Sequence, residues 1–383
     1  MTAGEAVQAA PARRLRRVAV FTTVLVSVLG LLFGVPWWTL VIAPNWPAPV
    51  QVAGSVVFAL AVLALPGTMV LGHGRGRDWA ARTGDTLLGV VWVLFTWSVL
   101  GNLLRIGLGP RAVAASVAAV SVLLLIYGYA EAMRVPRIRR VDVTVDRLGR
   151  GLDGTRVVML TDTHYGPIDR AAWSARVTKA VNALEPDIVC HAGDIADGSA
   201  DMRREQSAPL GAIEAKLARA YITGNHEYYS GVAGWLDRMA ELGWECLHNR
   251  HVVVERGGDR LVVAGIDDLT AAGSGLAGHG ADTAAALAGA DPQLPVLLLA
   301  HQPKQVGMAV HHGVDLQISG HTHGGQIWPF HYLVRTDQPS LSGLTRHGAR
   351  TQLYTSRGTG FWGPPFRIFA PSEITLITLR SGA

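Results

Sequence analysis

Four long apolar segments in the first third of the chain constrain its fold more than any other sequence feature. Each is almost free of charged residues and is 19–25 residues long, close to the roughly 20 residues that an α-helix needs to cross a bilayer. Buried helices of globular proteins are usually shorter, so four such segments predict a membrane region over residues 18–135. The segments are Val18–Ile42, Val50–Leu71, Thr86–Leu104 and Ala112–Met133.

The placement of arginines around these segments predicts their orientation. Arginines precede the first segment, lie between the second and third, and follow the fourth, whereas residues 43–49 between the first and second carry no charge. Positive residues accumulate on the cytoplasmic side of membrane proteins, so we expect a basic cytoplasmic N-terminus at residues 1–17 and a cytoplasmic C-terminal region. The alternative is export of the C-terminal region behind the pair Arg13 and Arg14. The arginines concerned are Arg13, Arg14, Arg16, Arg17, Arg75, Arg77, Arg82, Arg134, Arg137, Arg139 and Arg140.

The net charge of +5 does not require a nucleic acid partner, because eleven arginines flank the apolar segments. Anionic headgroups of membrane lipids are the simpler partner for this charge. Cys190 and Cys246 are the only cysteines. We expect Cys190 to be a small core residue; a disulfide between the two is an alternative that would be unusual in a cytoplasmic domain.

From about residue 141 the composition becomes that of a globular α/β protein, and residues 141–383 suffice for one domain with a substantial core. Short apolar runs alternate with helical patterns, which predicts an α/β sheet protein, with a second sheet possible in the strand-rich C-terminal half. Expected helices are Ala171–Leu184, Ala212–Arg219 and Trp235–Leu242. Expected strands are Arg156–Leu160, Asp187–Cys190, Ala220–Thr223, Leu261–Ile266, Val296–Ala300, Leu316–Ser319, Gln352–Thr355 and Glu373–Leu379.

Polar side chains follow five of the expected strands at the points where these strands end. Ligands of open α/β sheets collect at the carboxyl ends of strands, and histidine is the commonest metal ligand. The repeated pattern therefore indicates a metal or ligand site rather than five unrelated turns and caps. The residues are Asp162, His164, Asp194, Asn225, His301, His321 and His323.

The same segments resemble the calcineurin-like metallophosphoesterase superfamily. The motifs are DTH at 162–164, GDIAD at 193–197, GNHE at 224–227, AHQP at 300–303 and GHTHGGQ at 320–326. YTSRGTG at 354–360 and PSEITLITL at 371–379 are similar to a membrane-associated branch that includes lipid-directed phosphohydrolases. The resemblance covers residues 153–380 and excludes the four apolar segments. It implies a four-layer αββα sandwich.

The resemblance also implies a site for two metal ions. Asp162, His164, Asp194 and His323 would hold the first ion, and Asp194 would bridge to a second ion held by Asn225, His301 and His321. This set supplies nitrogen and oxygen without thiolate, which suits Mn, Fe or Zn. Two such ions can clamp a phosphoryl group and activate water at neutral pH.

Residues beside these motifs have expected supporting roles. His226 follows Asn225 and is the expected proton donor to the leaving oxygen. We expect Asp197 and Glu227 to orient ligands. Asp197 stands where related purple acid phosphatases have a tyrosine, so a coloured Fe(III)–tyrosinate centre is not expected. Arg357 is either a phosphate contact or an ordinary surface arginine.

Two aromatic loops, around Trp328 and Trp362, bear on the substrate. Either they pack together as a small satellite core, or they form an apolar wall for the chains of a lipid substrate. The leading hypothesis is a membrane-anchored phosphohydrolase that cleaves a phosphodiester, phosphomonoester or pyrophosphate, with a lipid-linked substrate as one option. A tethered nucleotide or phosphoprotein phosphatase is a second hypothesis. A non-catalytic membrane sensor or scaffold that binds phosphate is the third.

Overall fold

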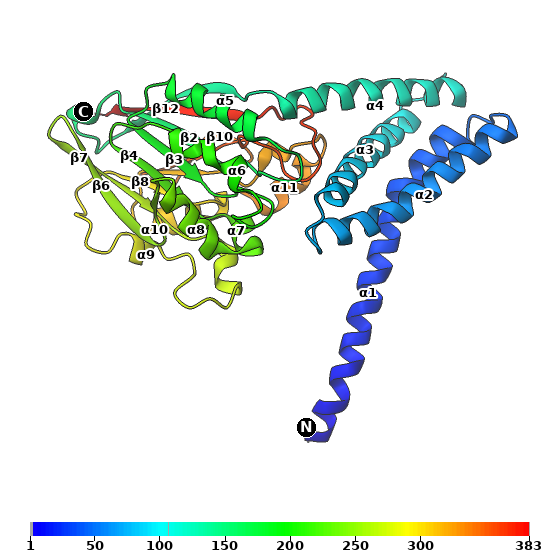
Figure 1. Ribbon diagram of the computed structural model, residues 1–383, viewed down its shortest axis with the longest axis horizontal. Helices are drawn as coiled ribbons and strands as arrows, with labels where there is room; N and C mark the ends of the chain where they lie inside the picture. Colours follow the sequence, from blue (N-terminus) through cyan, green and yellow to red (C-terminus); the bar gives the residue numbers. More distant parts are fainter. Residues whose placement is uncertain (1–2, 106, 383) are drawn as a thin grey trace. The chain divides into compact units, whose positions relative to one another are not determined.

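The structure is a computed structural model that describes residues 3–105 and 107–382, with side chains from Ala19 onward. The chain divides into two compact units, Met1–Ile126 and Tyr127–Ala383 (Figure 1). The boundary falls inside helix α4 (Pro110–Met133), so the last turns of this helix belong to the second unit.

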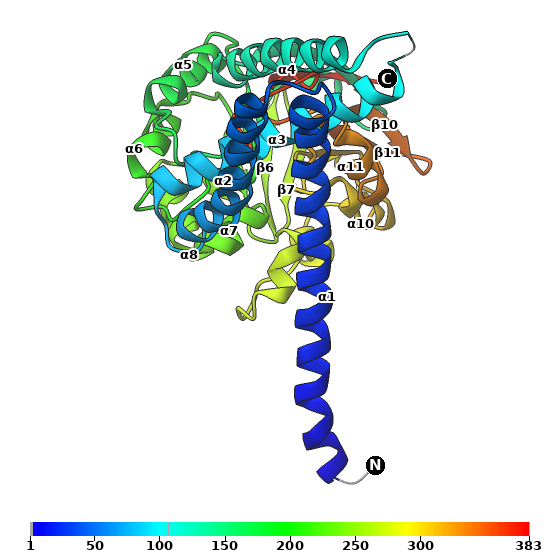
Figure 2. The same ribbon diagram turned by 90° about the vertical axis from the view of Figure 1, so that its right-hand side faces the viewer.

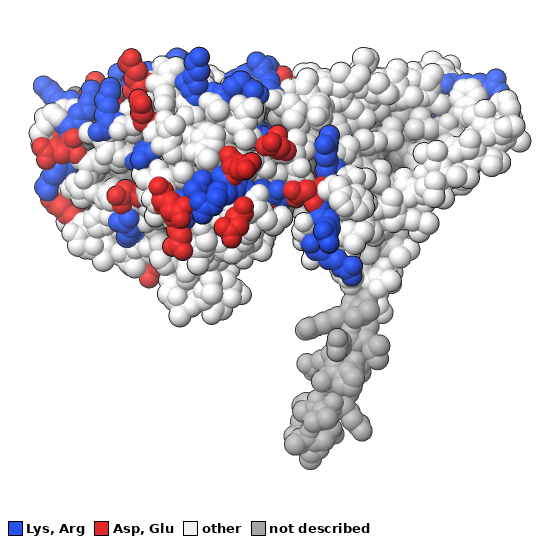
Figure 3. All heavy atoms as spheres, viewed as in Figure 1, with Lys and Arg blue, Asp and Glu red and all other residues white. Residues whose placement is uncertain are grey.

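The first unit consists of long apolar helices. They are α1 (Ala3–Trp37), continued by a π-helical turn at Trp38–Ile42, α2 (Ala48–Gly72), α3 (Asp78–Leu103) and the first part of α4. Four helical segments are long and apolar enough to cross a membrane, with mean hydropathies of 1.7 to 2.2, as predicted from the sequence. In Figure 3 the side chains described in this unit are mostly uncharged. Contrary to expectation, Arg82 lies inside α3 rather than between the second and third helices.

Helix contacts in the first unit combine apolar packing with a few internal polar bonds. Phe33, Leu65 and Val91 from α1, α2 and α3 form a small buried cluster. Asn102 Nδ2 of α3 donates to Thr39 Oγ1, 2.7 Å away. Such bonds satisfy polar groups that have no water partner in a bilayer.

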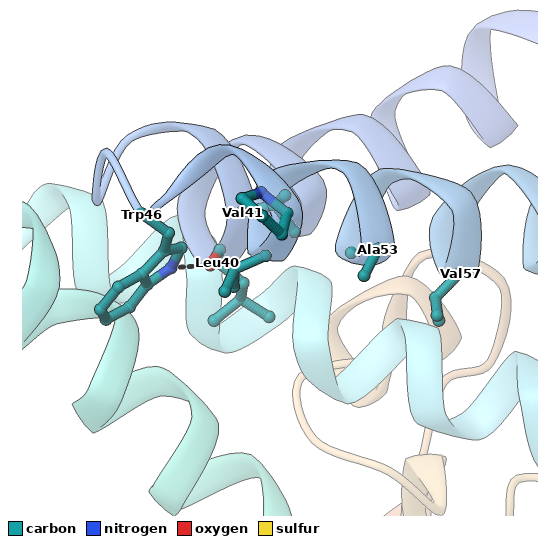
Figure 4. Close-up of a pocket in the computed structure, with 8 residues that line it drawn as sticks. Leu40, Val41, Trp46, Ala53 and Val57 are labelled. Carbon is teal, nitrogen blue, oxygen red and sulfur yellow. Dashed lines mark hydrogen bonds between the residues drawn. The ribbon is translucent and has the colours of Figure 1, made fainter.

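A hollow of about 510 Å³ lies between the π-helical turn that follows α1 and the first turns of α2. Its wall is apolar, and the Trp46 indole N–H at its rim donates to Leu40 O, 2.9 Å away (Figure 4). With no ionisable side chain in its lining, this hollow offers no group for catalysis.

The second unit contains two six-stranded mixed sheets. The first has the order β1-β12-β2-β3-β4-β5 and the second β10-β11-β9-β8-β7-β6. Strands β2, β3 and β4 are parallel, as are β7, β8 and β9. The bounds are β1 (Arg137–Val145), β2 (Arg156–Leu160), β3 (Ile188–Ala192), β4 (Ala218–Ile222), β5 (Glu245–Cys246), β6 (Arg250–Arg256), β7 (Asp259–Gly265), β8 (Val296–Leu299), β9 (Leu316–Ser319), β10 (Gly343–His347), β11 (Thr351–Thr355) and β12 (Glu373–Ser381).

Strand alternation explains how both faces of each sheet are buried. In β2, Val157 and Met159 point into the core between the two sheets, while Val158 and Leu160 point to the helices outside. A third cluster, which includes Val262 and Leu298, covers the outer face of the second sheet. Continuous apolar strands of this kind are typical of sheets covered on both faces.

Helices flank the pair of sheets on both sides, which completes the expected αββα layering. Figure 2 shows α5, α6 and α8 on one side of the sheets and α10 and α11 on the other. The helices are α5 (Ala171–Asn182), α6 (Arg204–Ser207), α7 (Asn225–Ser230), α8 (Val232–Glu241), α9 (Thr283–Ala286), α10 (Val306–His311) and α11 (His331–Asp337). Both cysteines are free, and Cys190 is a buried core residue as expected.

Most expected elements of the second unit are confirmed, but one helix is wrong. Only the start of the expected helix Ala212–Arg219 is helical, because Ala212 ends a 3₁₀ turn and Ala218 begins β4. The intervening backbone is held to neighbouring segments instead, since Leu217 N donates to Asp187 O at 2.8 Å. Strands β1, β5, β6 and β10 were not expected. β1 carries three arginines and is largely exposed, so it resembles a charged flank rather than a strand.

Candidate metal centre

The candidate ligands come together because their strands end at the same edge of the two sheets. Asp162 and His164 follow β2, Asp194 follows β3, and Asn225 begins α7 after β4. From the second sheet, His301 follows β8, and His321 and His323 follow β9. The loops are joined by backbone bonds within each sheet, such as Asp162 N to Gly193 O and Gly320 N to His301 O, both 3.0 Å.

The backbone at this edge adopts an uncommon conformation. Ten non-glycine residues among those the structure describes have positive φ angles, and five of them are candidate ligands. Left-handed backbone costs free energy for residues with a Cβ, and it clusters at functional sites. These five side chains are therefore aimed by loops that the surrounding structure must hold in place. They are Asp162, His164, Asp194, His321 and His323.

Asp162, His164 and His323 form one group of candidate ligand atoms that lie within 4.8 Å of one another. The Nε2 atoms of His164 and His323 are 3.2 Å apart, and His323 Nε2 is 3.4 Å from Asp162 Oδ1. His164 Nδ1 lies 3.0 Å from Asp197 Oδ1 and donates its proton there. In a neutral ring this leaves the Nε2 lone pair of His164 facing the other ligand atoms.

Asp194, His301 and His321 form a second group, whose candidate ligand atoms also lie within 4.8 Å of one another. His301 Nδ1 donates to Ala192 O at 2.8 Å, so its Nε2 lone pair faces Asp194 Oδ2 at 3.1 Å and Asn225 Oδ1 at 3.2 Å. Three acceptor atoms that face one another need a proton or a metal cation between them. His321 Nδ1 also approaches Asn225 Oδ1, at 3.0 Å. The donor chemistry of this group therefore fits a cation.

The carboxylates at the centre raise the pKa values of two neighbouring histidines. Burial lowers the pKa of His301, but the Asp194 carboxylate outweighs this effect and raises it well above the usual value. Burial likewise lowers the pKa of His226, but Asp194 and Asp197 raise it to about 9. Both imidazoles thus respond to a negative potential that would equally attract metal cations.

Asp197 links the candidate ligand His164 to the expected proton donor His226. Its Oδ1 atom is 3.0 Å from His164 Nδ1 and 2.7 Å from His226 Nδ1. The His226 backbone N–H also donates to Asp194 Oδ1 at 2.9 Å. His226 therefore stands beside the candidate ligands, and with His164 and Asp194 it forms a further group of potential metal-ligating atoms.

Glu227 connects the loops after β3 and β4. Its buried carboxylate accepts from the backbone N–H groups of Gly224, Asp194 and Ile195 at 2.6, 3.0 and 2.6 Å. Burial and the Asp194 charge raise the pKa of Glu227 to about 7. Its contacts are thus those of a residue that orients the Asp194 loop.

The aromatic loops lie close to parts of this centre. The Trp362 ring centroid is 5.9 Å from that of His226, and 48% of Trp362 is exposed. Gln326, the last residue of the glycine-rich motif, holds this loop, since its side chain bonds Trp362 N, Trp362 O and Pro364 O. Trp328 is partly buried, and its backbone N–H donates to Ile368 O, in the segment that follows Trp362.

Arg357 lies against Gly324 of the glycine-rich motif. A Cβ added to Gly324 would lie 2.9 Å from Arg357 Cγ, so the side chain covers this glycine. Arg357 as a whole residue is partly exposed. This position is compatible with a contact to a phosphate at the centre.

Arg367 is a buried residue beside the candidate ligand His323 that the sequence analysis missed. It is fully buried, and its guanidinium donates to the carbonyl oxygens of His323, Gly360, Arg357 and Ala370. Its Nη2 also lies 3.1 Å from His323 Nδ1. A guanidinium can only donate hydrogen bonds, and an imidazole that binds a metal through Nε2 carries its proton on Nδ1. With a metal on His323 Nε2, Arg367 Nη2 would therefore donate to Gly360 O and not to His323 Nδ1. Arg367 belongs to no recognisable motif. The only indication in the sequence was that this arginine lies in a segment rich in aromatic residues.

Comparisons with known proteins agree with this geometry. Residues 155–325 match the family model for calcineurin-like phosphoesterases. A transmembrane protein with metallophosphoesterase domain from Danio rerio is 37% identical over 323 residues, which cover 79% of this chain and 74% of the relative. The corresponding protein of Bos taurus is 35% identical over 68% of this chain, which spans only 61% of that relative.

A bacterial relative has a similar match. An uncharacterized metallophosphoesterase of Helicobacter pylori is 36% identical over 258 residues, or 66% of each chain. The match to the Danio rerio protein extends over more of the chain than the phosphoesterase model alone. The chain is therefore a membrane protein with four candidate spans that belongs to the calcineurin-like metallophosphoesterase family.

Proposed function

We propose that the protein is a membrane-anchored phosphohydrolase with a centre for two metal ions. Asp162, His164, Asp194 and His323 would hold one ion, and Asn225, His301 and His321, together with Asp194, would hold the second. The observation that carries this proposal is the convergence of acceptor atoms around His301 Nε2, which a cation would reconcile. The nitrogen and oxygen ligands suit Mn, Fe or Zn equally.

Two bound ions would polarise the phosphoryl group and lower the pKa of a water molecule. The chain itself supplies the proton for the leaving oxygen. His226 is held by Asp197 at 2.7 Å, and its pKa of about 9 favours the imidazolium form at neutral pH. Metal ions at Asp194 would withdraw part of the charge that raises this pKa, which brings His226 closer to the range of an effective general acid. Arg357 is the proposed contact to a phosphate oxygen.

The exposed aromatic loops support an amphiphilic, lipid-linked substrate. Trp362, Phe369 and Tyr332 are 48%, 59% and 60% exposed. The segment that carries Phe369 packs on the last turns of α4, because Arg367 N donates to Gly128 O at 2.9 Å and the Phe369 and Tyr127 rings are 6.5 Å apart. α4 is a candidate span that ends at Met133. This segment therefore belongs at the level of the membrane surface, where apolar chains of a substrate are available.

The catalytic unit is proposed to lie on the cytoplasmic side, because arginines precede the first span and follow the fourth. A reporter fused after Ala383 tests this orientation. Cytoplasmic reporter activity is the expected result, whereas activity of a reporter that works only after export would reverse the orientation.

Turnover assays distinguish an enzyme from a phosphate-binding scaffold. The full chain in detergent, loaded with Mn²⁺, is assayed against phosphomonoesters, phosphodiesters and lipid pyrophosphates. We expect turnover of at least one class, with His301→Ala inactive. His312→Ala, at an exposed position directly after α10, should be fully active. Metal binding without turnover of any class would favour the scaffold.

A further inference from the structure

Outside the candidate metal centre, the described residues bring together one other group of metal-ligating side chains, His248, Asp267 and His279. Their candidate ligand atoms all lie within 4.8 Å of one another. His248 lies between β5 and β6, Asp267 follows β7, and His279 lies in the connection from β7 to α9. The fold, rather than a local sequence motif, therefore creates this group, which we call the His248 cluster.

A buried carboxylate forms the base of the His248 cluster. The Asp267 side chain is 1% exposed, and its Oδ1 lies 2.6 Å from His248 Nδ1. His279 Nδ1 approaches Asp267 Oδ2 to 3.8 Å, and the two imidazole rings are 4.5 Å apart. Two imidazoles on one side of a carboxylate form a donor set typical of Zn²⁺ and other first-row divalent ions.

A network of hydrogen bonds fixes the backbone around this carboxylate. Asp267 Oδ2 accepts from Gly280 N at 3.0 Å. Asn249 donates to Gly280 O at 2.6 Å, and its Oδ1 accepts from Asp267 N and Asp282 N at 3.2 and 3.1 Å. Partners that orient ligands in this way accompany most protein metal sites. The loop that carries His279 is thereby tied to Asp267.

The cluster is open to solvent on its histidine side. The side chains of His248 and His279 are 33% and 16% exposed. The Tyr228 hydroxyl lies 3.0 Å from His279 Nδ1. Three protein ligands with solvent access leave a position for water, which the tetrahedral preference of zinc would use.

We propose that the His248 cluster binds a further divalent ion, with Zn²⁺ the best fit, separate from the two ions of the catalytic centre. The ion would clamp the exposed loop at residues 272–278 onto the body of the second unit. Tyr228 carries this restraint to α7, which also holds Asn225 and His226. Asp268, the residue after Asp267, connects the cluster to the catalytic centre as well. Its carboxylate accepts a hydrogen bond of 2.9 Å from Gln302 Nε2, and Gln302 follows His301 in the chain.

Hydrogen bonds alone are the competing explanation, because His248 can donate to Asp267 and Tyr228 can donate to His279. Metal analysis separates the two. The full chain in detergent is stripped with a chelator, equilibrated with Zn²⁺ and analysed for zinc per chain, with His248→Gln and His279→Gln as variants. We expect about three ions in the wild type and about two in each variant. His312→Gln, an exposed histidine directly after α10, is the matched control and should keep the wild-type count.

Limited proteolysis of the loop at residues 272–278 provides a readout that does not depend on activity. Zn²⁺ should slow cleavage about tenfold in the wild type and in His312→Gln, but not in the two cluster variants. An unchanged zinc count in the cluster variants would overturn the site, and zinc-insensitive cleavage in the wild type would overturn the clamp. Thermal melts identify a variant that fails to fold, and the other variant then decides the question.

Discussion

The two units of this protein use polar residues in opposite ways. In the first unit, large apolar side chains face outward, as with Leu63 at 75% exposure, and few polar groups are internal. In the second unit, Asp162 and His301 are completely buried at the ends of strands. A lipid environment accepts any apolar surface, whereas a buried carboxylate needs specific partners. Substitutions should therefore be tolerated on the lipid-facing surface and costly at the strand ends.

Asp194→Asn should give the largest difference between the two units. The Asp194 carboxylate lies 3.1 Å from His301 Nε2 and 3.6 Å from His164 Nε2, so both proposed ions depend on its charge. We expect turnover to fall about 10³-fold or more, with loss of catalytic metal by elemental analysis. Leu63→Ala on the lipid-facing surface is the matched control and should retain wild-type turnover. Equal losses in the two variants would contradict the contrast between the units.

His226→Ala should have the next largest effect, and the effect should depend on the leaving group. A general acid matters most for a poor leaving group, so we expect a loss of about 10²–10⁴ in kcat on an alkyl ester and much less on a nitrophenyl ester. Metal content should not change. Equal losses on both esters, or loss of metal, would mean that His226 is a structural residue or a ligand.

Asp197→Asn should have an intermediate effect, because it keeps the shape of the side chain that touches His164 and His226 but removes its charge. Loss of such an orienting partner typically costs about 10–100-fold in metal affinity or activity. The kcat on an alkyl ester and the metal affinity should both decrease. Asp169→Asn, which alters only a turn before α5, is the control. If Asp197→Asn kept the wild-type kcat and metal affinity, Asp197 would not orient His164 and His226 as proposed.

Trp362→Ser should give the smallest effect and act on one class of substrate. Loss of the exposed indole should raise KM about tenfold for an amphiphilic ester in micelles, with little change for a short soluble ester. Leu344→Ser on strand β10 is a control that also removes an exposed apolar side chain. A similar change in KM for both esters would assign Trp362 to the packing of its loop and weaken the lipid proposal.

The same contrast explains what the sequence could predict. The four spans follow from composition alone, since length and hydropathy suffice for a helix in a bilayer. Strands such as β2 and β9 were predictable with their bounds, because they are apolar runs that end at chemically distinctive residues. Strand β1 was not, because its arginines are exposed and its pairing with β12 joins opposite ends of the second unit.

Within the candidate site, local motifs identified residues but not the contacts between them. Asn225 and Asp194 belong to recognisable motifs, and in the structure both lie within hydrogen-bond distance of His301 Nε2. Arg367 and the His248 cluster could not be found in this way. Their partners lie far away in the sequence, so their roles depend on tertiary packing rather than on spacing.

Metal reconstitution in the His248→Gln/His279→Gln background most directly tests the central claim, because it removes the proposed extra ion. Metal-stripped full-length protein in detergent is titrated with Mn²⁺ while bound metal and phosphoester turnover are recorded together. We predict that turnover rises from near zero and saturates at about two ions per chain. Full turnover by the metal-free protein, or saturation with metal and no turnover of any phosphoester, would contradict the account.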